Sequence, residues 1–267
     1  MKKYISFFRL RFLIGLSYRT AALAGIVTQF VWGAMEIMVY RAFYHADAAA
    51  FPMSFSATAS YIWLQQAFLA VFMIWIMENE IFDAISDGNI AYELCRPVRI
   101  YDMWFARSMA NRLARASLRC FPILIVAAFI KQPYGIARPA DVKSFLLFLL
   151  TMVLGLLVTV AFCNLIYVLT FFMISPWGLK ILASSAVEFL SGAIIPLPFL
   201  PDRIRFVVEL LPFASMQNTP LRVYSGNIAG MELIRAVCLQ IFWIVVLVSV
   251  GKILCATAVR RMTVQGG

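Results

Sequence analysis

The chain has 267 residues, of which 63% are hydrophobic and 13% are charged. Soluble domains average roughly 45–50% apolar and about 25% charged residues, so this composition excludes an ordinary soluble protein and indicates an integral membrane protein. The formal net charge of +10 is better explained by binding to phospholipid headgroups than by binding to nucleic acid. Outside the apolar segments, the sequence has no arginine-rich or aromatic-interleaved stretch that could form a soluble basic surface. We therefore expect membrane lipids as partners and no nucleic acid.

Residue types that carry out chemistry are scarce. His45 is the only histidine, which removes most zinc and histidine-based acid–base arrangements. The five cysteines have no paired ligand spacing and are interpreted as small buried apolar residues. Gly251-Lys252 is no phosphate-binding loop, because Ile253 follows it and the upstream glycine is missing. We expect no catalytic residue, metal or cofactor on this chain, and any nucleotide hydrolysis on another chain.

Residues 1–18 are basic and aromatic. Ile5, Phe8, Phe12 and Leu16 fall within a narrow helical stripe, a pattern typical of a helix that lies in the membrane interface. We predict an N-terminal interfacial helix over this range.

Six apolar segments follow, and most reach the roughly 20 residues that a bilayer core requires. The third is short unless its helix begins before the arginines that precede it. An even number of spans places both termini on one side, and that side collects most of the 23 lysines and arginines. Both termini should therefore be cytoplasmic. The predicted spans are 20–43, 59–77, 118–130, 145–174, 179–200 and 233–258.

The most charged part of the chain separates the second and third spans. Apolar residues from Ile74 to Ile85 keep helical spacing, so the second span is expected to continue until Asp87-Gly88-Asn89 stops it. A short cross-helix over 90–94 is then bounded by Pro97, and a new helix starts at Ile100. We predict a polar cytoplasmic elbow over residues 78–107.

Arginines continue beyond this elbow. Arg112, Arg115 and Arg119 have the spacing of one helical stripe and are expected to reach lipid phosphates as the chain re-enters the bilayer.

The connection over residues 196–230 is the other irregular stretch. Its prolines are expected to break the fifth span before its end, and its apolar run 206–211 is too short to cross a bilayer. We predict an outer re-entrant region, which is tolerated only where protein shields its backbone. The prolines are Pro196, Pro198, Pro201, Pro212 and Pro220.

This order of parts resembles the permease subunit of a type-2 ABC exporter. The local likeness is Ile85-Ser-Asp-Gly88-Asn-Ile90 followed by Leu94-Cys-Arg96-Pro97, which is similar to the "I-x-x-G-x-I … L-x-x-P" run of a subfamily of paired bacterial permeases. The likeness covers the whole chain in topology and is specific only near residues 78–104. It implies an all-α integral membrane fold with one transmembrane permease domain over 1–267.

The resemblance also implies partners. Two ATP-hydrolysing subunits, which carry the ATP and Mg, would bind the elbows of two permeases in the bacterial cytoplasmic (inner) membrane. The second permease would be a different homologous chain or, alternatively, a second copy of this one. Ile90, Tyr92 and Leu94 are expected to serve as apolar knobs. The residues assigned to ATPase coupling are Asp83, Ile85, Gly88, Ile90, Tyr92, Glu93, Leu94, Arg96 and Pro97.

Two carboxylates fall inside predicted spans. Ionisation of Glu36 and Glu188 in hydrocarbon would be costly, so such residues usually face a partner or a wet cavity. Together with Gln29 and Gln65 they are assigned to the substrate path, where they would favour cationic amphiphiles. Alternatively, Glu36 pairs with Arg41 near the outer headgroups and Glu188 is satisfied by a neighbouring helix.

Other functions stay open at this point. The substrates implied by the resemblance include hydrophobic or cationic drugs, peptides and lipid-linked molecules. An ion-coupled secondary transporter could use Glu36 and Glu188 as ion sites, but the chain has no inverted repeat. An intramembrane lipid-modifying enzyme would need a histidine or an acidic cluster at the membrane surface.

Overall fold

The computed structural model describes residues 2–173 and 175–261, and within these ranges it contains helices and no strand. The all-α prediction is therefore confirmed. Met1, Ile174 and residues 262–267, which belong to the predicted single domain, lie outside the described residues. The elements are α1 (Lys2–Leu16), α2 (Arg19–Ala46), α3 (Phe55–Ala67), α4 (Leu69–Phe72), η1 (Ile74–Ile76), α5 (Asn79–Ser86), α6 (Ile90–Leu94), α7 (Ile100–Phe129), α8 (Val142–Thr170), α9 (Pro176–Leu190), η2 (Leu197–Phe199), α10 (Asp202–Leu210), α11 (Pro212–Met216), α12 (Asn218–Tyr224) and α13 (Gly230–Arg261).

Three helices of the described chain are long and apolar enough to cross a membrane, namely α2, α8 and α13. They correspond to the predicted first, fourth and sixth spans. Helix α7 carries the third predicted span and begins at Ile100, so its helix does start before the arginines. Half of the residues in the most apolar stretch of α8 are buried, and α8 packs against α13, α12 and α7.

The second predicted span is not one continuous helix. The backbone leaves the helical conformation at Met73 and is extended again at Met77 and Glu78. The expectation that this span runs on to residue 87 is therefore wrong. Ile74 and Ile81 are nonetheless almost fully buried, because the apolar spacing reflects the burial of an irregular segment.

The fifth predicted span ends earlier than residue 200. Helix α9 stops at Leu190, with Ser191 as its C-cap, and Gly192 follows at a φ of 83°. The break thus precedes the prolines that were expected to cause it, since a left-handed backbone is readily adopted by glycine.

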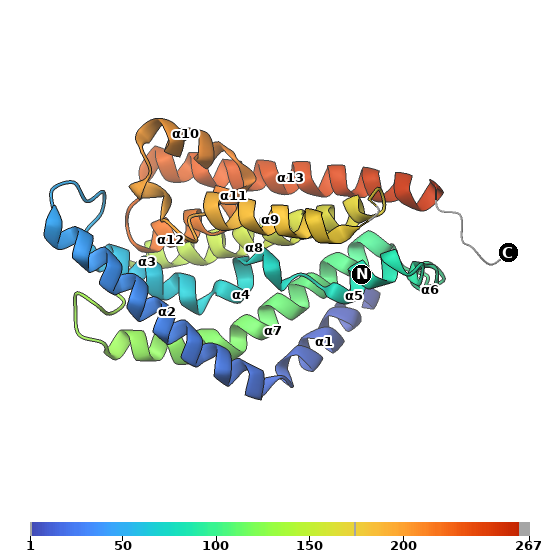
Figure 1. Cartoon of the computed structure of the whole chain (residues 1–267), viewed down its shortest axis with the longest axis horizontal. Coiled ribbons are helices and arrows are strands. Elements are labelled where there is room, and N and C mark those ends of the chain that lie inside the picture. The colour runs from blue at the N-terminus through green and yellow to red at the C-terminus, as the bar shows by residue number, and fades with distance from the viewer. Residues whose placement is uncertain (1, 174, 262–267) are drawn as a thin grey trace.

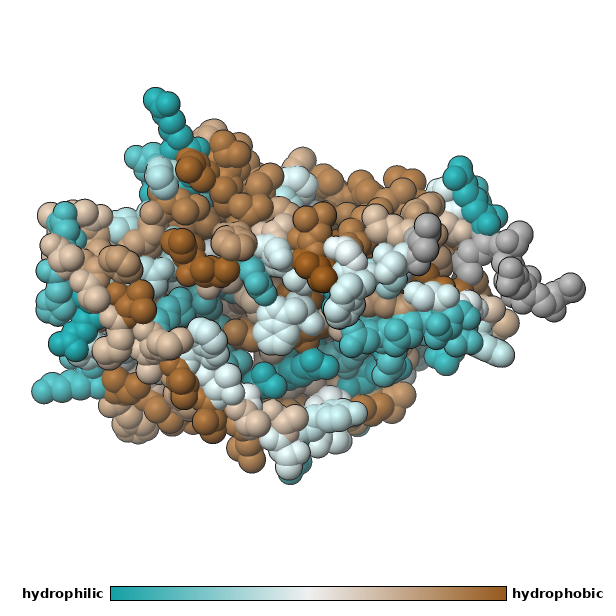
Figure 2. Space-filling view, viewed as in Figure 1, coloured by the Kyte–Doolittle hydropathy of each residue, from teal (hydrophilic) through white to brown (hydrophobic). Residues whose placement is uncertain are grey.

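Helices α8, α9 and α13 run along the long axis of the molecule, whereas α1 and α2 run obliquely to it (Figure 1). Helices α5 and α6 lie at the end that carries the last turns of α13, whereas α10, α12 and the loop after α2 lie at the opposite end (Figure 1). Apolar residues cover much of the visible surface, and hydrophilic residues lie at its left edge and in a strip that runs from the middle of the view to the right (Figure 2).

Candidate functional site

A cavity of about 1250 Å³ lies beside α2 and is bordered by α3, α4, α7 and α9. The predicted substrate-path residues Gln29, Glu36, Gln65 and Glu188 all line it, although they come from three different helices. The structure thus brings these four side chains to one cavity. That a substrate passes them stays a prediction.

Few polar contacts satisfy these groups. Gln66 Nε2 donates a hydrogen bond of 3.4 Å to Glu36 Oε2, and Gln65 Nε2 donates one of 2.7 Å to the Ala193 carbonyl. The Oε1 atoms of Gln29, Glu36 and Gln65 are buried without a hydrogen-bond partner in the described chain. An unpaired polar group is costly to bury, so these three oxygens need a donor that the described chain does not supply.

The alternative partner for Glu36 lies elsewhere. Arg41 Nε donates to His45 Nε2 at 3.4 Å, and the guanidinium lies over the Tyr134 ring, 5.4 Å from its centroid. Within the described chain no ion pair joins Arg41 to Glu36. The hypothesis of a Glu36–Arg41 pair is therefore wrong.

The remaining wall of the cavity is mostly apolar and aromatic. Trp32 and Trp75 are about half exposed and both line it, as do Phe43, Phe51 and Phe199. Aromatic rings bury large areas against flat or apolar ligands, so this wall can hold an apolar body.

Arg119 is a cavity residue that sequence reasoning missed. Its guanidinium lies so close to Gly25 that a Cβ atom added to this glycine would be 2.6 Å from the Arg119 Cζ atom. The Arg119 Nε atom is buried and has no hydrogen-bond partner in the described chain. The expectation that Arg119 reaches lipid phosphates is not what the structure shows, because the side chain lines the cavity. An arginine inside an apolar span was the available signal.

Arg112 is only 2% exposed, which also contradicts the expected contact with lipid phosphates. Its Nη1 donates to the carbonyls of Ala70, Val71 and Met73 at 3.4, 3.0 and 2.9 Å, and its Nη2 donates to Cys163 Sγ at 3.1 Å. These carbonyls lie where the second span leaves the helical conformation. The planar guanidinium therefore stabilises the interruption.

Further acid–base pairs join α7 to the start of the elbow. Arg107 pairs with Glu80, and its Nε lies 3.6 Å from Glu78 Oε2, while Asn111 Nδ2 donates to Glu78 Oε1 at 2.8 Å. Arg11 approaches Glu80 at 3.8 Å. Burial, together with the charge of Arg107, lowers the pKa of the Arg11 guanidinium, against the opposing effect of Glu80, Glu78 and Glu93. Helix α7 and residues 78–80 thus form one connected unit.

The elbow itself has the predicted form. Gly88 adopts a φ of 75° after α5, the cross-helix spans Ile90–Leu94, and α7 begins at Ile100. A left-handed residue at this position is what glycine supplies at a helix end. Trp104 Nε1 donates to Glu93 Oε2 at 2.8 Å and ties the cross-helix to α7.

The coupling residues divide by exposure. Ile90 is fully buried, so the expectation that it projects as a knob is wrong. Tyr92 is 77% exposed. Ile85, Glu93 and Leu94 are half-buried, whereas Asp83, Gly88, Arg96 and Pro97 are exposed. The accessible surface is therefore polar, with one projecting aromatic ring.

Helix α1 holds the elbow from the other side. Lys3 Nζ donates to the Pro97 carbonyl at 3.2 Å, and the Arg99 backbone N–H donates to Tyr4 Oη at 3.0 Å. The same helix packs along α7. These contacts restrain the segment that connects α6 to α7.

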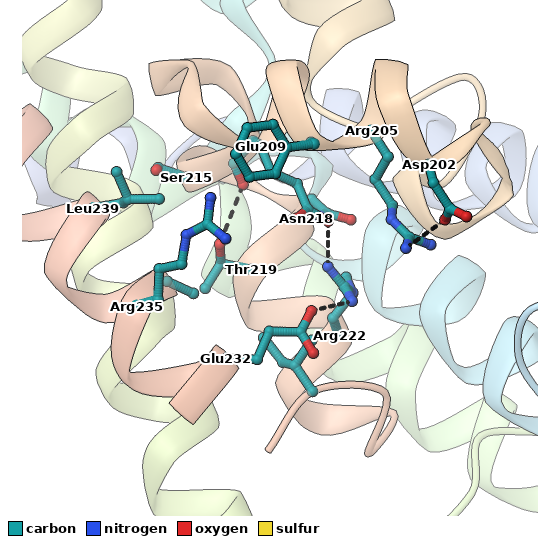
Figure 3. Close-up of a pocket in the computed structure, with 14 residues that line it drawn as sticks. Asp202, Arg205, Glu209, Ser215, Asn218, Thr219, Arg222, Glu232, Arg235 and Leu239 are labelled. Carbon is teal, nitrogen blue, oxygen red and sulfur yellow. Dashed lines mark hydrogen bonds and ion pairs between the residues drawn. The ribbon is translucent and has the colours of Figure 1, made fainter. Parts of the chain in front are cut away.

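The predicted re-entrant region forms a second, polar cavity of about 410 Å³. Arg222 is 6% exposed and donates to Glu209, Glu232 and Asn227 at 2.6, 2.8 and 2.6 Å. Figure 3 shows this cluster with Arg235 beside it on α13. The buried guanidinium is fully paired, so the cluster joins α10 and α12 to the start of α13.

These features define the membrane subunit of a transporter: apolar helices, a large cavity bordered by several of them, and a polar elbow at one end. Residues 24–266 match the model of the ABC-2 family transporter protein family. The chain belongs to this family of ABC transporter permeases, whose members associate with ABC ATPase subunits. No curated protein matches the chain closely.

Proposed function

We propose that this chain is the transmembrane permease subunit of an ABC exporter and works with two ATPase subunits and a second permease. The second permease is a different homologous chain in the arrangement we favour, and a second copy in the alternative. ATP and Mg are held by the ATPases. This chain provides part of the substrate path and a mechanical link, with no chemical catalysis of its own.

The proposed topology has six spans, of which the second is interrupted and the fifth is α9 together with the segment that follows it. Helix α1 lies in the interface, and residues 196–230 form the outer re-entrant region. Both termini and α6 face the cytoplasm of a bacterial inner membrane. The distribution of basic residues supports this orientation.

The observation that carries the proposal is the continuous connection from α6 to the cavity wall. Glu93 on α6 is bonded to Trp104 on α7. Farther along α7, Arg112 binds the carbonyl of Met73, and Met73 lines the cavity. Movement of α6 by a closing ATPase pair would therefore be passed to the cavity by packed elements with fixed contacts. Alternating access would follow from that movement.

The class is tested by asking what is bound after gentle detergent extraction. We expect an ATPase and a permease to copurify with the chain, because in the proposed function separate subunits hold and hydrolyse the ATP. Purification of a single polypeptide that transports solute alone would contradict the proposal.

The elbow is tested by Gly88→Pro. Proline fixes φ near −65°, which is incompatible with the φ of 75° at Gly88, so α6 should be displaced. The matched control is Gly226→Pro, since Gly226 also has a positive φ of 69° but belongs to the re-entrant region. We expect at least about a tenfold loss of stimulated ATP hydrolysis for Gly88→Pro and a much smaller loss for the control. Equal losses would remove the elbow from the mechanism.

A second candidate is an ion-coupled transporter, because Glu36 and Glu188 line the same cavity. Such a protein should drive uptake into vesicles on an ion gradient without ATP. Glu36→Gln should then abolish the gradient dependence.

A further inference from the structure

The cavity is lined by charges of opposite sign at different positions along α2. Arg119 lies against Gly25, near the start of α2, and Glu36 lies farther along the same helix. At about 1.5 Å per residue, the interval from Gly25 to Glu36 corresponds to roughly 16 Å along the helix axis. The cation and the carboxylate therefore line separate parts of one cavity.

Two more carboxylates line the cavity. Asp47, the C-cap residue of α2, follows Glu36 towards the end of that helix, and Glu188 lies in the last turn of α9. Arg119 is the one cation in its described lining. The cavity is thus negative towards the end of α2 and positive towards its start.

Three charged residues of the cavity lie within helices, and none of them has an oppositely charged partner in the described residues. The ion pairs of that part of the chain do not involve Glu36, Glu188 or Arg119. An unpaired charge within a membrane protein is costly and usually marks a pathway. A ligand with complementary charges would offset that cost at both ends.

The space between the charges suits an apolar body. Trp32 and Met35, which lie between Gly25 and Glu36 along α2, line the cavity, and its volume of about 1250 Å³ exceeds that of most small-molecule sites. The ligand should therefore be apolar along its length and carry an acidic group at one end and a basic group at the other.

We propose that the cavity binds short apolar peptides with free termini. This inference rests on the proposed function and names its substrate class. The peptide carboxylate binds the Arg119 guanidinium, and the terminal ammonium lies near Glu36. An extended chain spans about 3.3 Å per residue, so roughly five residues match the separation of the charges.

The test measures binding of defined peptides to the purified protein, with its copurifying subunits, in lipid nanodiscs. Tryptophan fluorescence reports occupancy, because Trp32 and Trp75 line the cavity. The probe is the pentapeptide leucine-alanine-leucine-alanine-leucine with free ends, compared with its N-acetylated and C-amidated forms. We expect each blocked form to bind at least about tenfold more weakly, since each loses a charge-assisted contact.

Two variants assign the ends. Arg119→Gln should abolish the preference for a free carboxylate and leave the preference for a free ammonium, and Glu36→Gln should do the reverse. Gly25→Ala keeps the charge of Arg119 but displaces its guanidinium, so it should weaken carboxylate recognition alone. Because each variant is judged on the ratio between two peptides, a general loss of folding cannot produce the expected pattern.

The proposal is overturned if the free pentapeptide fails to bind, if blocked and free forms bind equally, or if Arg119→Gln keeps the carboxylate preference. The last result would show that Arg119 does not bind the peptide carboxylate. None of these outcomes depends on copurification of an ATPase, so failure of the peptide proposal leaves the proposed function standing.

Discussion

Arg112→Met should destabilise the chain strongly while leaving its helices long and apolar. The substitution removes all four hydrogen bonds of the guanidinium, three of them to carbonyls at the interruption of the second span. Leaving a buried acceptor unpaired costs about 1–3 kcal/mol, and three backbone carbonyls lose their donor at once. Because neighbouring losses are not additive, we expect a loss of about 3–5 kcal/mol in the free energy of unfolding.

The assay is denaturant-induced unfolding in mixed micelles, followed by tryptophan fluorescence. Arg115→Met is the matched control, since Arg115 lies on the same helix but is exposed, and its change should stay within about 0.5 kcal/mol. Arg112→Lys should fall between the two, because an ammonium keeps the charge but lacks the planar fork of donors. If Arg112→Met unfolds like the Arg115 control, the guanidinium does not stabilise the interruption.

The remaining predictions concern packing, coupling and the re-entrant region. Gly155→Ala should lower the free energy of unfolding by about 1–3 kcal/mol, because its Cβ would lie 2.2 Å from the Met216 carbonyl; Gly178→Ala, with open space around it, should change stability little in the same denaturation assay. Tyr92→Ala should reduce substrate-stimulated ATP hydrolysis by the complex while leaving expression unchanged, and wild-type stimulation would argue against contact at this ring. Arg222→Gln should destabilise by about 3–5 kcal/mol, because it leaves two carboxylates without their buried cation; unchanged unfolding would contradict that assignment.

Features encoded by short-range chemistry could be predicted from the sequence. The helices α2, α8 and α13 follow from uninterrupted apolar length. The cross-helix at Ile90–Leu94 follows from two residues. Gly88 permits a left-handed backbone before it, and Pro97 disfavours the helical conformation of the residue that precedes it, so that the helix ends there. In both cases the determining residues lie within a few positions of the element.

The interruption of the second span could not be predicted in this way. Its apolar spacing is compatible with a continuous helix, and the interaction that stabilises the break comes from Arg112, some forty positions later. Periodicity reports which side chains are buried and not whether the backbone between them is helical. The burial of Ile90 could not be predicted for a related reason. A five-residue helix has too few residues for its apolar spacing to define a buried face.

The cavity was only partly foreseeable. Glu36 and Glu188 were identified because carboxylates are rare in apolar spans, yet their shared cavity depends on how α2 and α9 pack. The sequence favours a position of Arg119 at the membrane surface, because arginines near the end of a span commonly extend their guanidinium towards the headgroups. Its place beside Gly25 requires a tertiary contact that no local pattern reveals.

The central claim is that a separate ATPase binds this chain at α6, and photo-cross-linking tests it most directly. A photoreactive amino acid at Tyr92, which is 77% exposed, is compared with one at Met231, which is 78% exposed. Met231 lies in the first turn of α13, and α13 begins at the end of the molecule opposite α6 (Figure 1). On illumination of whole cells, Tyr92 should capture an ATPase subunit and Met231 should not. Capture of the ATPase at Met231, or of no ATPase at Tyr92, would contradict the account.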